Sequence, residues 1–363
     1  MVAMMESIRA DPARFEVIAK PSILARTLHA IVHTGSLTWL VLSYHVAMPP
    51  VSRVRPLDVF AGADLAALRR VSGWRGLALV LHAWLVVLTV LALATWADSL
   101  LAGLLAVPLI GGRQLGLAIL MHEAAHGLLH PDRRINEFVG KWLCAVPVGA
   151  DLAAYRRYHF EHHRFTQQPE DPDLVLSAPF PTTPASLGRK LWRDLSGQTF
   201  FRQRIARSGA TMGQTPARDQ TQDKTPAISQ VDRDFLLFNL GLSALLYAIM
   251  GPWSVLLWWL AMITWMQLAL RIRNIAEHAC TATGDDPFSH ARTTRAGWVA
   301  RALVAPYFVN HHAEHHLFTF MPCYSLPRAH GLLKAAGLTD RMTIAPSYGA
   351  VLRQVTRPLE MPS

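Results

Sequence analysis

Histidine is the residue type whose number and spacing point most directly to chemistry in this sequence. The chain contains 17 histidines, and ten of them fall in four short segments. Residues at i, i+3 and i+4 share one face of a helix, so each segment directs two or three polar side chains at one point. This pattern is typical of helices that present metal ligands. The four segments are HEAAH (His122 to His126), HFEHH (His159 to His163), NIAEH (Asn274 to His278) and HHAEHH (His311 to His316).

The number of imidazoles indicates two metal ions. Nitrogen ligands suit zinc, copper, iron or nickel. A tetrahedral zinc site uses about four ligands, so about nine histidines would leave most of them unused at a single ion. We therefore predict a site for two metals.

Each segment also carries a glutamate next to a histidine. An imidazole that binds a metal needs its second ring nitrogen held, commonly by a carboxylate, which fixes the orientation of the ring. The glutamates are candidates for that role, and the alternative for each is a solvated acid on a helix surface. Asp171 and Asp173, after the second segment, either hold a histidine in the same way or cap a turn. The four glutamates are Glu123, Glu161, Glu277 and Glu314.

The segments resemble the motifs of a known family. HEAAH, HFEHH and HHAEHH look like the three histidine boxes of the membrane fatty acid desaturase and hydroxylase superfamily, HxxxH followed by two HxxHH. Asn274 and His278 resemble the additional Asn and His that acyl desaturases place before the last box, where the Asn holds a metal-bound water. The stretch from Asn310 to His330 is similar to the ending of bacterial and acyl-lipid desaturases. The resemblance runs from about residue 25 to residue 340.

The resemblance implies a non-haem di-iron centre with nine histidine ligands. Asn274 would act through a bound water. His311 also has an i+4 partner in His315, and only the HxxHH register favours His312 over it. Carried over residue by residue, the implied ligands are His122, His126, His159, His162, His163, His278, His312, His315 and His316.

The same resemblance implies an activity. The cofactors would be two iron ions that cycle between Fe2+ and Fe3+, with O2 as co-substrate. The reaction would be desaturation of a fatty acyl chain, and hydroxylation or carotenoid ketolation are the alternatives within the superfamily. The sequence has neither a Gly-rich dinucleotide fingerprint nor a CxxC motif, so electrons would come from a separate ferredoxin or cytochrome b5-like carrier. The other partner would be a membrane lipid or acyl substrate.

Two functions of other classes compete with this interpretation. HEAAH alone is also the zinc metalloprotease pattern, with Glu123 as general base, and intramembrane proteases carry it. That reading leaves the two HxxHH boxes and His278 unexplained. A metal sensor or transporter would predict ionisable residues within the membrane spans, and the long apolar stretch Phe235 to Leu270 has none. We therefore rank both below the oxidoreductase.

The elements that must position the histidines are predicted to be membrane helices. Hydrophobic residues make up 51% and charged residues only 17% of the 363 residues, which suits a bilayer better than water. The net charge of +10 favours anionic lipid or an acidic protein partner over nucleic acid. A span needs roughly 20 apolar residues. The stretches that meet this need are Gly76 to Ala97, Ser99 to Met121 with Arg113 inside it, and the two halves of Phe235 to Leu270, which Gly251-Pro252 divides.

We therefore predict an all-α integral membrane protein with about four transmembrane helices in two hairpins. Arginines flank the hairpins on one side, and by the positive-inside rule this side is cytoplasmic. All four histidine segments would then share one site in a cytoplasmic helical cap, at a bacterial inner membrane. Thr27 to Ser52 is either a further span or a re-entrant or interfacial helix. We expect one membrane-embedded domain over residues 1–363, with a mobile cytoplasmic loop at 209–231.

Overall fold

The computed structural model describes residues 51–210, 229–283 and 286–357, without the side chains of 206–210. The described residues belong to one packed unit. They are mostly helical, as predicted, and the strands among them are the short β1 (Arg292–Thr294) and β2 (Thr343–Ala345), which pair in parallel. The predicted N-terminal helix at 27–52 lies outside the described residues, apart from its last two.

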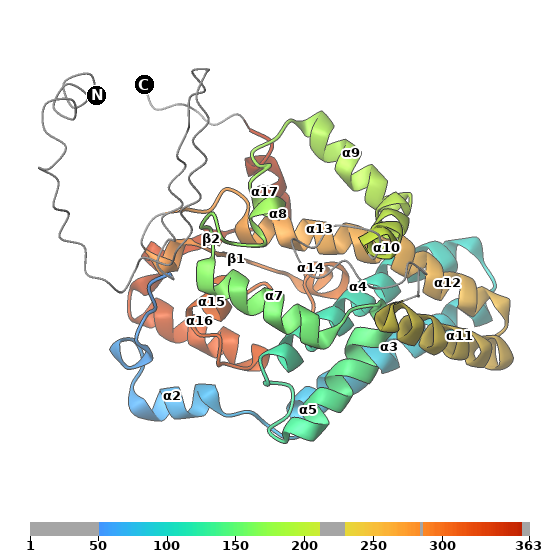
Figure 1. Ribbon diagram of the computed structural model, residues 1–363, viewed down its shortest axis with the longest axis horizontal. Helices are drawn as coiled ribbons and strands as arrows, with labels where there is room; N and C mark the ends of the chain where they lie inside the picture. The colour runs from blue at the N-terminus through green and yellow to red at the C-terminus, as the bar shows by residue number, and fades with distance from the viewer. Residues whose placement is uncertain (1–50, 211–228, 284–285, 358–363) are drawn as a thin grey trace, which may run out of the picture. The chain divides into compact units, whose positions relative to one another are not determined.

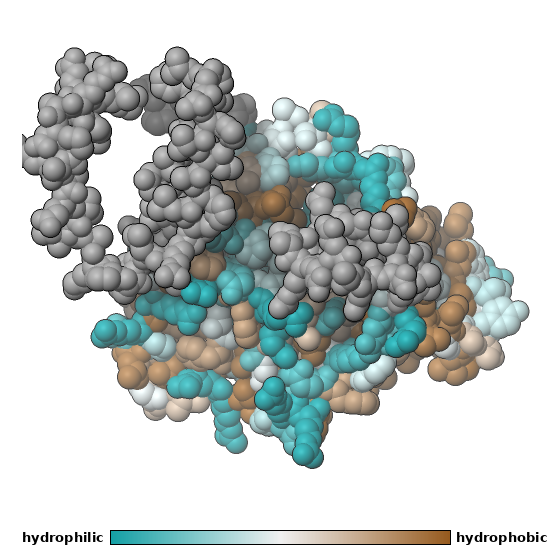
Figure 2. Space-filling view, in the orientation of Figure 1, coloured by the Kyte–Doolittle hydropathy of each residue, from teal (hydrophilic) through white to brown (hydrophobic). Residues whose placement is uncertain are grey.

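Four helices are long and apolar enough to cross a membrane (Figure 1). They are α3 (Arg75–Ala97), α4 (Leu100–Ala125), α11 (Gln230–Met250), and α12 (Pro252–Ile263) with its continuation α13 (Trp265–His278). Apolar side chains on their outer faces are exposed, as the brown residues around α11 and α12 show (Figure 2). This is the surface expected of helices whose solvent is lipid.

The spans differ from the sequence prediction at their ends. The apolar pattern stops at Met121, but α4 continues to Ala125 and carries the first histidine segment in its last turn. In the same way, α13 continues beyond Leu270 to His278. The histidines at these two ends are therefore held by the spans themselves.

The other helices precede the first span, connect the spans or follow the last one. The two ends of the predicted loop at 209–231 are helical, because α10 extends to Ala210 and α11 begins at Gln230, and residues 211–228 lie outside the described part. The short helices are η1 (Pro56–Asp58), η3 (Pro287–Ser289), η4 (Cys323–Ser325), η5 (Leu338–Arg341) and the π-helix η2 (Gly140–Ala145). The α-helices are α2 (Gly62–Arg69), α5 (Arg133–Val139), α6 (Val146–Val148), α7 (Leu152–Phe165), α8 (Leu174–Ser177), α9 (Pro184–Leu195), α10 (Gln198–Ala210), α14 (Trp298–Leu303), α15 (His312–Leu317), α16 (Leu326–Ala335) and α17 (Tyr348–Gln354).

Helix α4 packs against most of the elements that carry the site. Its glycines permit close approach: a Cβ at Gly112 would lie 2.4 Å from the carbonyl oxygen of Ala302, next to the C-terminus of α14. Arg113 follows Gly112 and is buried. Its guanidinium donates to the carbonyl oxygens of Arg301 and Ala302 at 2.7 and 2.8 Å. This arginine within an apolar helix therefore faces protein, where carbonyl groups near the C-terminus of α14 accept hydrogen bonds from it.

Candidate metal centre

Nine of the ten histidines in the four segments lie together in two groups. Within each group, one nitrogen of every ring lies within 4.8 Å of the corresponding nitrogens of the other rings. The nine are the same histidines that the family resemblance implies as ligands. We call the two sets the five-histidine group and the four-histidine group. The first contains His122, His126, His159, His163 and His315, and the second contains His162, His278, His312 and His316.

Three helices contribute to each group. The five-histidine group takes its rings from the end of α4 and from α7 and α15, and the four-histidine group takes them from α7, α13 and α15. Both α7 and α15 serve both groups, because neighbouring positions in each HxxHH box point to different sides. His162 and His163 are adjacent in sequence, yet each belongs to a different group.

The ring nitrogens converge at distances that suit shared coordination. The Nε2 atom of His315 lies 3.0 Å from Nε2 of His122 and 3.0 Å from Nε2 of His163. In the other group, Nε2 of His312 lies 2.8 Å from that of His278 and 3.0 Å from that of His316. A metal–nitrogen bond of about 2.1 Å places neighbouring ligand nitrogens about 3 Å apart, so these separations fit a metal ion at each group.

The outer ring nitrogens support the same conclusion. Nδ1 of His278 lies 3.2 Å from the carbonyl oxygen of His290 and donates to it. Nδ1 of His162 lies 2.8 Å from a carboxylate oxygen of Asp171. A neutral ring that donates through Nδ1 carries a lone pair on Nε2, and these two Nε2 atoms are only 3.2 Å apart. Two lone pairs at that distance repel each other, and a cation between them removes the repulsion.

Asp171 is the carboxylate that the sequence left open between a turn cap and a histidine partner. It is 5% exposed, and one of its oxygens faces His162 while the other accepts the backbone N–H of Gln167 at 2.9 Å. Asp173 lies farther from the same ring, at 3.7 Å. Asp171 therefore does both: it holds a histidine and organises the turn that follows α7.

Two of the four glutamates lie beside a histidine of the groups. Glu123 is 3.6 Å from Nδ1 of His122, and its other oxygen accepts the backbone N–H of Cys323 at 2.8 Å. Glu277 is 3.5 Å from Nδ1 of His312. Both carboxylates thus lie near an outer ring nitrogen without a hydrogen bond to it, and their role as partners of the ligands stays a prediction.

The other two glutamates lie elsewhere. The side chain of Glu161 is 55% exposed and lies 4.0 Å from Arg164. It is therefore a solvated acid on the helix surface, which was the alternative to a partner of a metal ligand. Glu314 is fully buried and bonds to the hydroxyl of Thr293 and to Nδ1 of His330. It lies 3.8 Å from His311, the histidine that belongs to neither group.

Asn274 lies one helical turn before His278 on α13 and is partly buried. The oxygen of its side-chain amide accepts a hydrogen bond from the guanidinium of Arg273 at 2.8 Å. It lines a small pocket together with Glu277 and His278. The structure thus places Asn274 next to a member of the four-histidine group.

Burial controls the protonation of the imidazoles that lie outside the candidate spans. It lowers the pKa of His126 to about 3, with a smaller effect from His122. Neutral imidazole is the form that binds a metal. His162 differs: burial alone lowers its pKa, but the hydrogen bond and charge of Asp171, together with the charges of Asp173 and Glu277, raise it. Burial places the pKa well below the ordinary value for His159, His163, His312, His315 and His316.

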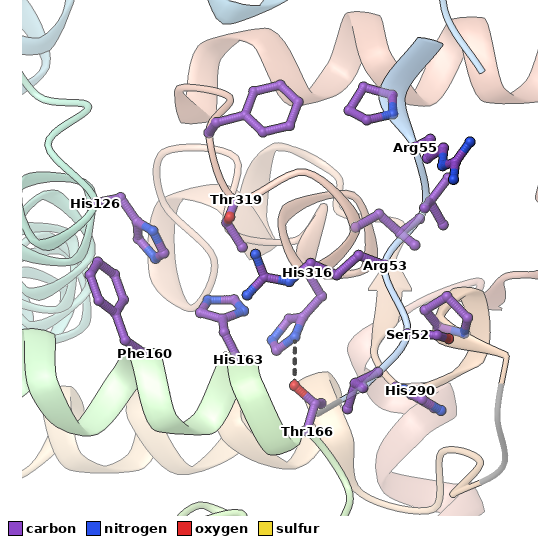
Figure 3. Close-up of a pocket in the computed structure, with 16 residues that line it drawn as sticks. Ser52, Arg53, Arg55, His126, Phe160, His163, Thr166, His290, His316 and Thr319 are labelled. Atoms are coloured by element: carbon purple, nitrogen blue, oxygen red, sulfur yellow. Dashed lines mark hydrogen bonds between the residues drawn. The ribbon is translucent and has the colours of Figure 1, made fainter. Parts of the chain in front are cut away.

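A cavity of about 650 Å³ gives access to both groups (Figure 3). His126 and His163 of the five-histidine group line it, and so does His316 of the four-histidine group. We call it the central cavity. Nothing in the sequence pattern indicated it, because its walls come from distant stretches of the chain. Its volume lies within the range of about 300 to 1,000 Å³ that is usual for small-molecule sites.

Comparison with known proteins gives consistent results. A family model described as fatty acid desaturase matches residues 98–347, which include all four histidine segments. The dihydrorhizobitoxine desaturase of Bradyrhizobium elkanii is 27% identical over 242 residues, which cover 62% of this chain and 66% of that protein. The zeaxanthin 4-ketolase of Chlamydomonas reinhardtii is 36% identical over 66 residues, or 18% of this chain and 15% of that protein. The chain thus spans just under two thirds of the length of the first relative and a short part of the second.

Proposed function

The chain belongs to the fatty acid desaturase family, and from this we propose that it is an O2-dependent di-iron oxidoreductase that introduces a C=C bond into the alkyl chain of a lipid. The observation that carries the proposal is the pair of histidine groups, each of which contributes to the lining of one cavity. All nine donors are imidazoles, which suit iron, and their number matches two metal ions.

The nine histidines would hold the irons, and the irons would supply the O2 chemistry that side chains alone lack. An unactivated C–H bond is not broken by acid–base groups at neutral pH. Burial favours the neutral form of most of these imidazoles, and partners such as Asp171 and the carbonyl of His290 fix the orientation of the rings. The central cavity admits an alkyl chain to both groups at once.

The electron donor is proposed to be a separate ferredoxin or cytochrome b5-like protein. The described residues contain only two strands of three residues each, so no dinucleotide-binding βαβ unit lies within them. A membrane lipid or acyl compound is the other proposed partner.

A carotenoid ketolase or a hydroxylase of the same superfamily is the second candidate. The short match to the zeaxanthin 4-ketolase favours the ketolase. The zinc metalloprotease interpretation has less support, because Glu123 already accepts a backbone hydrogen bond and lies among nine clustered histidines.

The test of the reaction compares cells with and without the protein. Mass spectrometry of total lipid should show a species that has lost one pair of hydrogens, and cells that carry His163→Ala should lack it. A product that gains oxygen instead would establish the hydroxylase or ketolase. Metal analysis of the purified protein should find two irons per chain, and one zinc per chain with retained activity would contradict the di-iron site.

The proposed sidedness places both groups on the cytoplasmic face of the inner membrane. Cys323 is 3% exposed and is unsuited to labelling, so engineered cysteines are needed. A membrane-impermeant thiol reagent added to intact cells should label Asp98→Cys, at the far end of α3, and should not label Glu161→Cys on α7. Labelling of the second variant from outside would reverse the proposed orientation.

A further inference from the structure

The central cavity carries a charge that the proposed centre does not explain. Two arginines line it, Arg53 and Arg55. Figure 3 shows Arg53 extending into the cavity toward His163 and His316, whereas Arg55 lies on the far side and points away from them. None of the described residues that line the cavity is acidic. Within residues 51–210, 229–283 and 286–357, no carboxylate forms an ion pair with Arg53.

The charge of Arg53 is unexpected next to the two histidine groups, because metal ions held there would also be positive. Their nine donors are neutral when they bind a metal, and neither group contains a carboxylate. The carboxylates that lie behind the rings, among them Asp171 and Glu277, would offset only part of the positive charge of two metal ions held there. Arg53 is an exposed residue, so water screens part of its charge, but a guanidinium that faces the same cavity would still be repelled by these metal ions. An anion bound between the arginine and the histidines removes this repulsion.

The remaining walls indicate what else the ligand contains. Phe160 is 46% exposed, and its ring lies 5.3 Å from that of His126. Leu317 and Phe320 line the cavity as well. These apolar side chains suit an alkyl chain, while a guanidinium suits a carboxylate or a phosphate, which it binds through two parallel hydrogen bonds.

We propose that Arg53 binds the anionic group of the substrate, so that the substrate is an alkyl compound with a carboxylate or phosphate held inside the central cavity. This inference rests on the proposed function, because it takes the cavity as the place where the alkyl chain reacts. Arg53 acts as a specificity-determining residue that selects anionic compounds over neutral ones of the same chain length.

Binding to the full-length, metal-containing protein without an electron donor tests the proposal, because no turnover takes place. Isothermal titration in a neutral membrane mimic would use dodecanoate, dodecyl phosphate and dodecanol as probes. At least one anionic probe should bind about 10 to 100-fold more tightly than dodecanol, as expected for hydrogen bonds between charged groups. Arg53→Gln should lower that preference by about 10-fold or more and leave dodecanol binding unchanged, and Arg53→Lys should restore part of it.

Arg55→Gln is the matched control, since it removes the same charge two residues away. It should retain the preference for the anion. Equal losses in the two variants would reveal a general effect of surface charge and overturn the proposal, as would an unchanged preference in Arg53→Gln. Whichever anionic probe binds more tightly identifies the group as carboxylate or phosphate.

Iron content and lipid products, measured on the same variants, separate the two proposals. Suppose that the wild-type protein forms the desaturated product, and that Arg53→Gln and the wild type bind dodecanoate with the same affinity. Only the proposed role of Arg53 then fails. If the wild-type protein holds no iron and forms no product, the proposed function fails, whatever the cavity binds.

Discussion

The orientation of each imidazole depends on the partner of its outer nitrogen. For His162 that partner is Asp171, for His278 it is the backbone carbonyl of His290, and for His316 the hydroxyl of Thr166 lies 3.3 Å away. Of these three partners only Asp171 is charged. The backbone also holds this carboxylate in place, because its oxygens accept the N–H groups of Gln167 and Asp173.

Asp171→Asn should weaken metal binding by the four-histidine group. The amide removes the charge that favours a donating Nδ1 on His162, and its NH2 group opposes the backbone N–H of Gln167 or leaves His162 without an acceptor. Losses of this type commonly cost about 10 to 100-fold in metal affinity or activity. Chelator competition on the purified protein measures the affinity.

Glu161→Gln is the control for this substitution. The side chain of Glu161 is 55% exposed on the same helix, so its neutralisation should change neither metal affinity nor product formation. An equal effect of the two substitutions would mean that Asp171 acts only through the overall charge of α7 and its surroundings.

His278→Ala and Asn274→Ala should separate metal binding from rate. His278 belongs to the four-histidine group, so its loss should lower bound iron and abolish turnover. Asn274 is a neutral amide that competes poorly with imidazole for iron, and we expect it to act through a bound water. Asn274→Ala should keep most of the iron and lose about 10 to 100-fold in rate. Iron content and product formation measured side by side decide this, and a fully active Asn274→Ala protein would end the assignment.

The sequence identified the histidines of the site better than the residues around them. The i+4 rule could not separate His311 from His312, since each has a histidine partner one turn later. The structure separates them because α15 begins at His312, while His311 lies before it and beside Glu314. Helical geometry could have corrected the expectation for Glu161, which lies on the opposite face of α7 from the three histidines.

At the scale of elements, α4 places the first histidine segment and also supports the chain that leads to the last one. Its Gly112 admits the end of α14, and Tyr307 follows α14 and packs against Gly116 of the same helix. The residues after Tyr307 lead directly to α15. Movement of α14 away from α4 would therefore displace α15 and the three imidazoles that it carries.

Gly112→Ala should destabilise the protein. The new Cβ would lie 2.4 Å from a backbone oxygen, so α4 and α14 must separate. Overpacking of this type costs about 1 to 3 kcal/mol, and the displacement should also lower iron content. Thermal unfolding in detergent measures the stability.

Gly241→Ala on α11 is the matched control. No atom lies within 4 Å of its added Cβ, and alanine favours a helix over glycine, so its melting temperature should stay the same or rise. If both variants melted at the same temperature as the wild type, the close approach at Gly112 would not contribute to stability.

The spans were predictable because a run of uncharged residues has few other uses. Gly76 to Ala97 corresponds to α3 almost residue for residue. The packing of α14 against α4 was not predictable, since it depends on the hydrogen bonds from Arg113 to carbonyls 188 and 189 residues away. A buried arginine within an apolar stretch indicates a polar partner but does not say which one.

At the scale of the whole molecule, the two histidine groups join segments between residues 122 and 316. Burial holds the pKa of His126 at about 3, against about 6.5 in an unfolded chain, and it lowers the pKa of several neighbouring imidazoles in the same direction. As the pH falls below about 6.5, the unfolded state therefore takes up protons that the folded state does not. Stability is then lost, at about 1.4 kcal/mol per pH unit for each such group.

Acidification should thus release the metals and lower the melting temperature together. Metal content and thermal unfolding between about pH 7.5 and 5 test this, because the groups concerned titrate through that window in the unfolded chain. Removal of the metals by a chelator at neutral pH should reproduce part of the loss. A melting temperature that stays constant across the window would contradict the prediction.

The position of the last histidine segment also determines when during synthesis the centre can form. Both groups need it, since His315 belongs to one group and His312 and His316 belong to the other. Helix α15 carries all three and follows the fourth candidate span. The ribosome must therefore translate beyond residue 316 before either group has its full set of imidazoles, and by then all the described candidate spans have been made. A metal ion that bound to a nascent or truncated chain would therefore be held by an incomplete set of imidazoles.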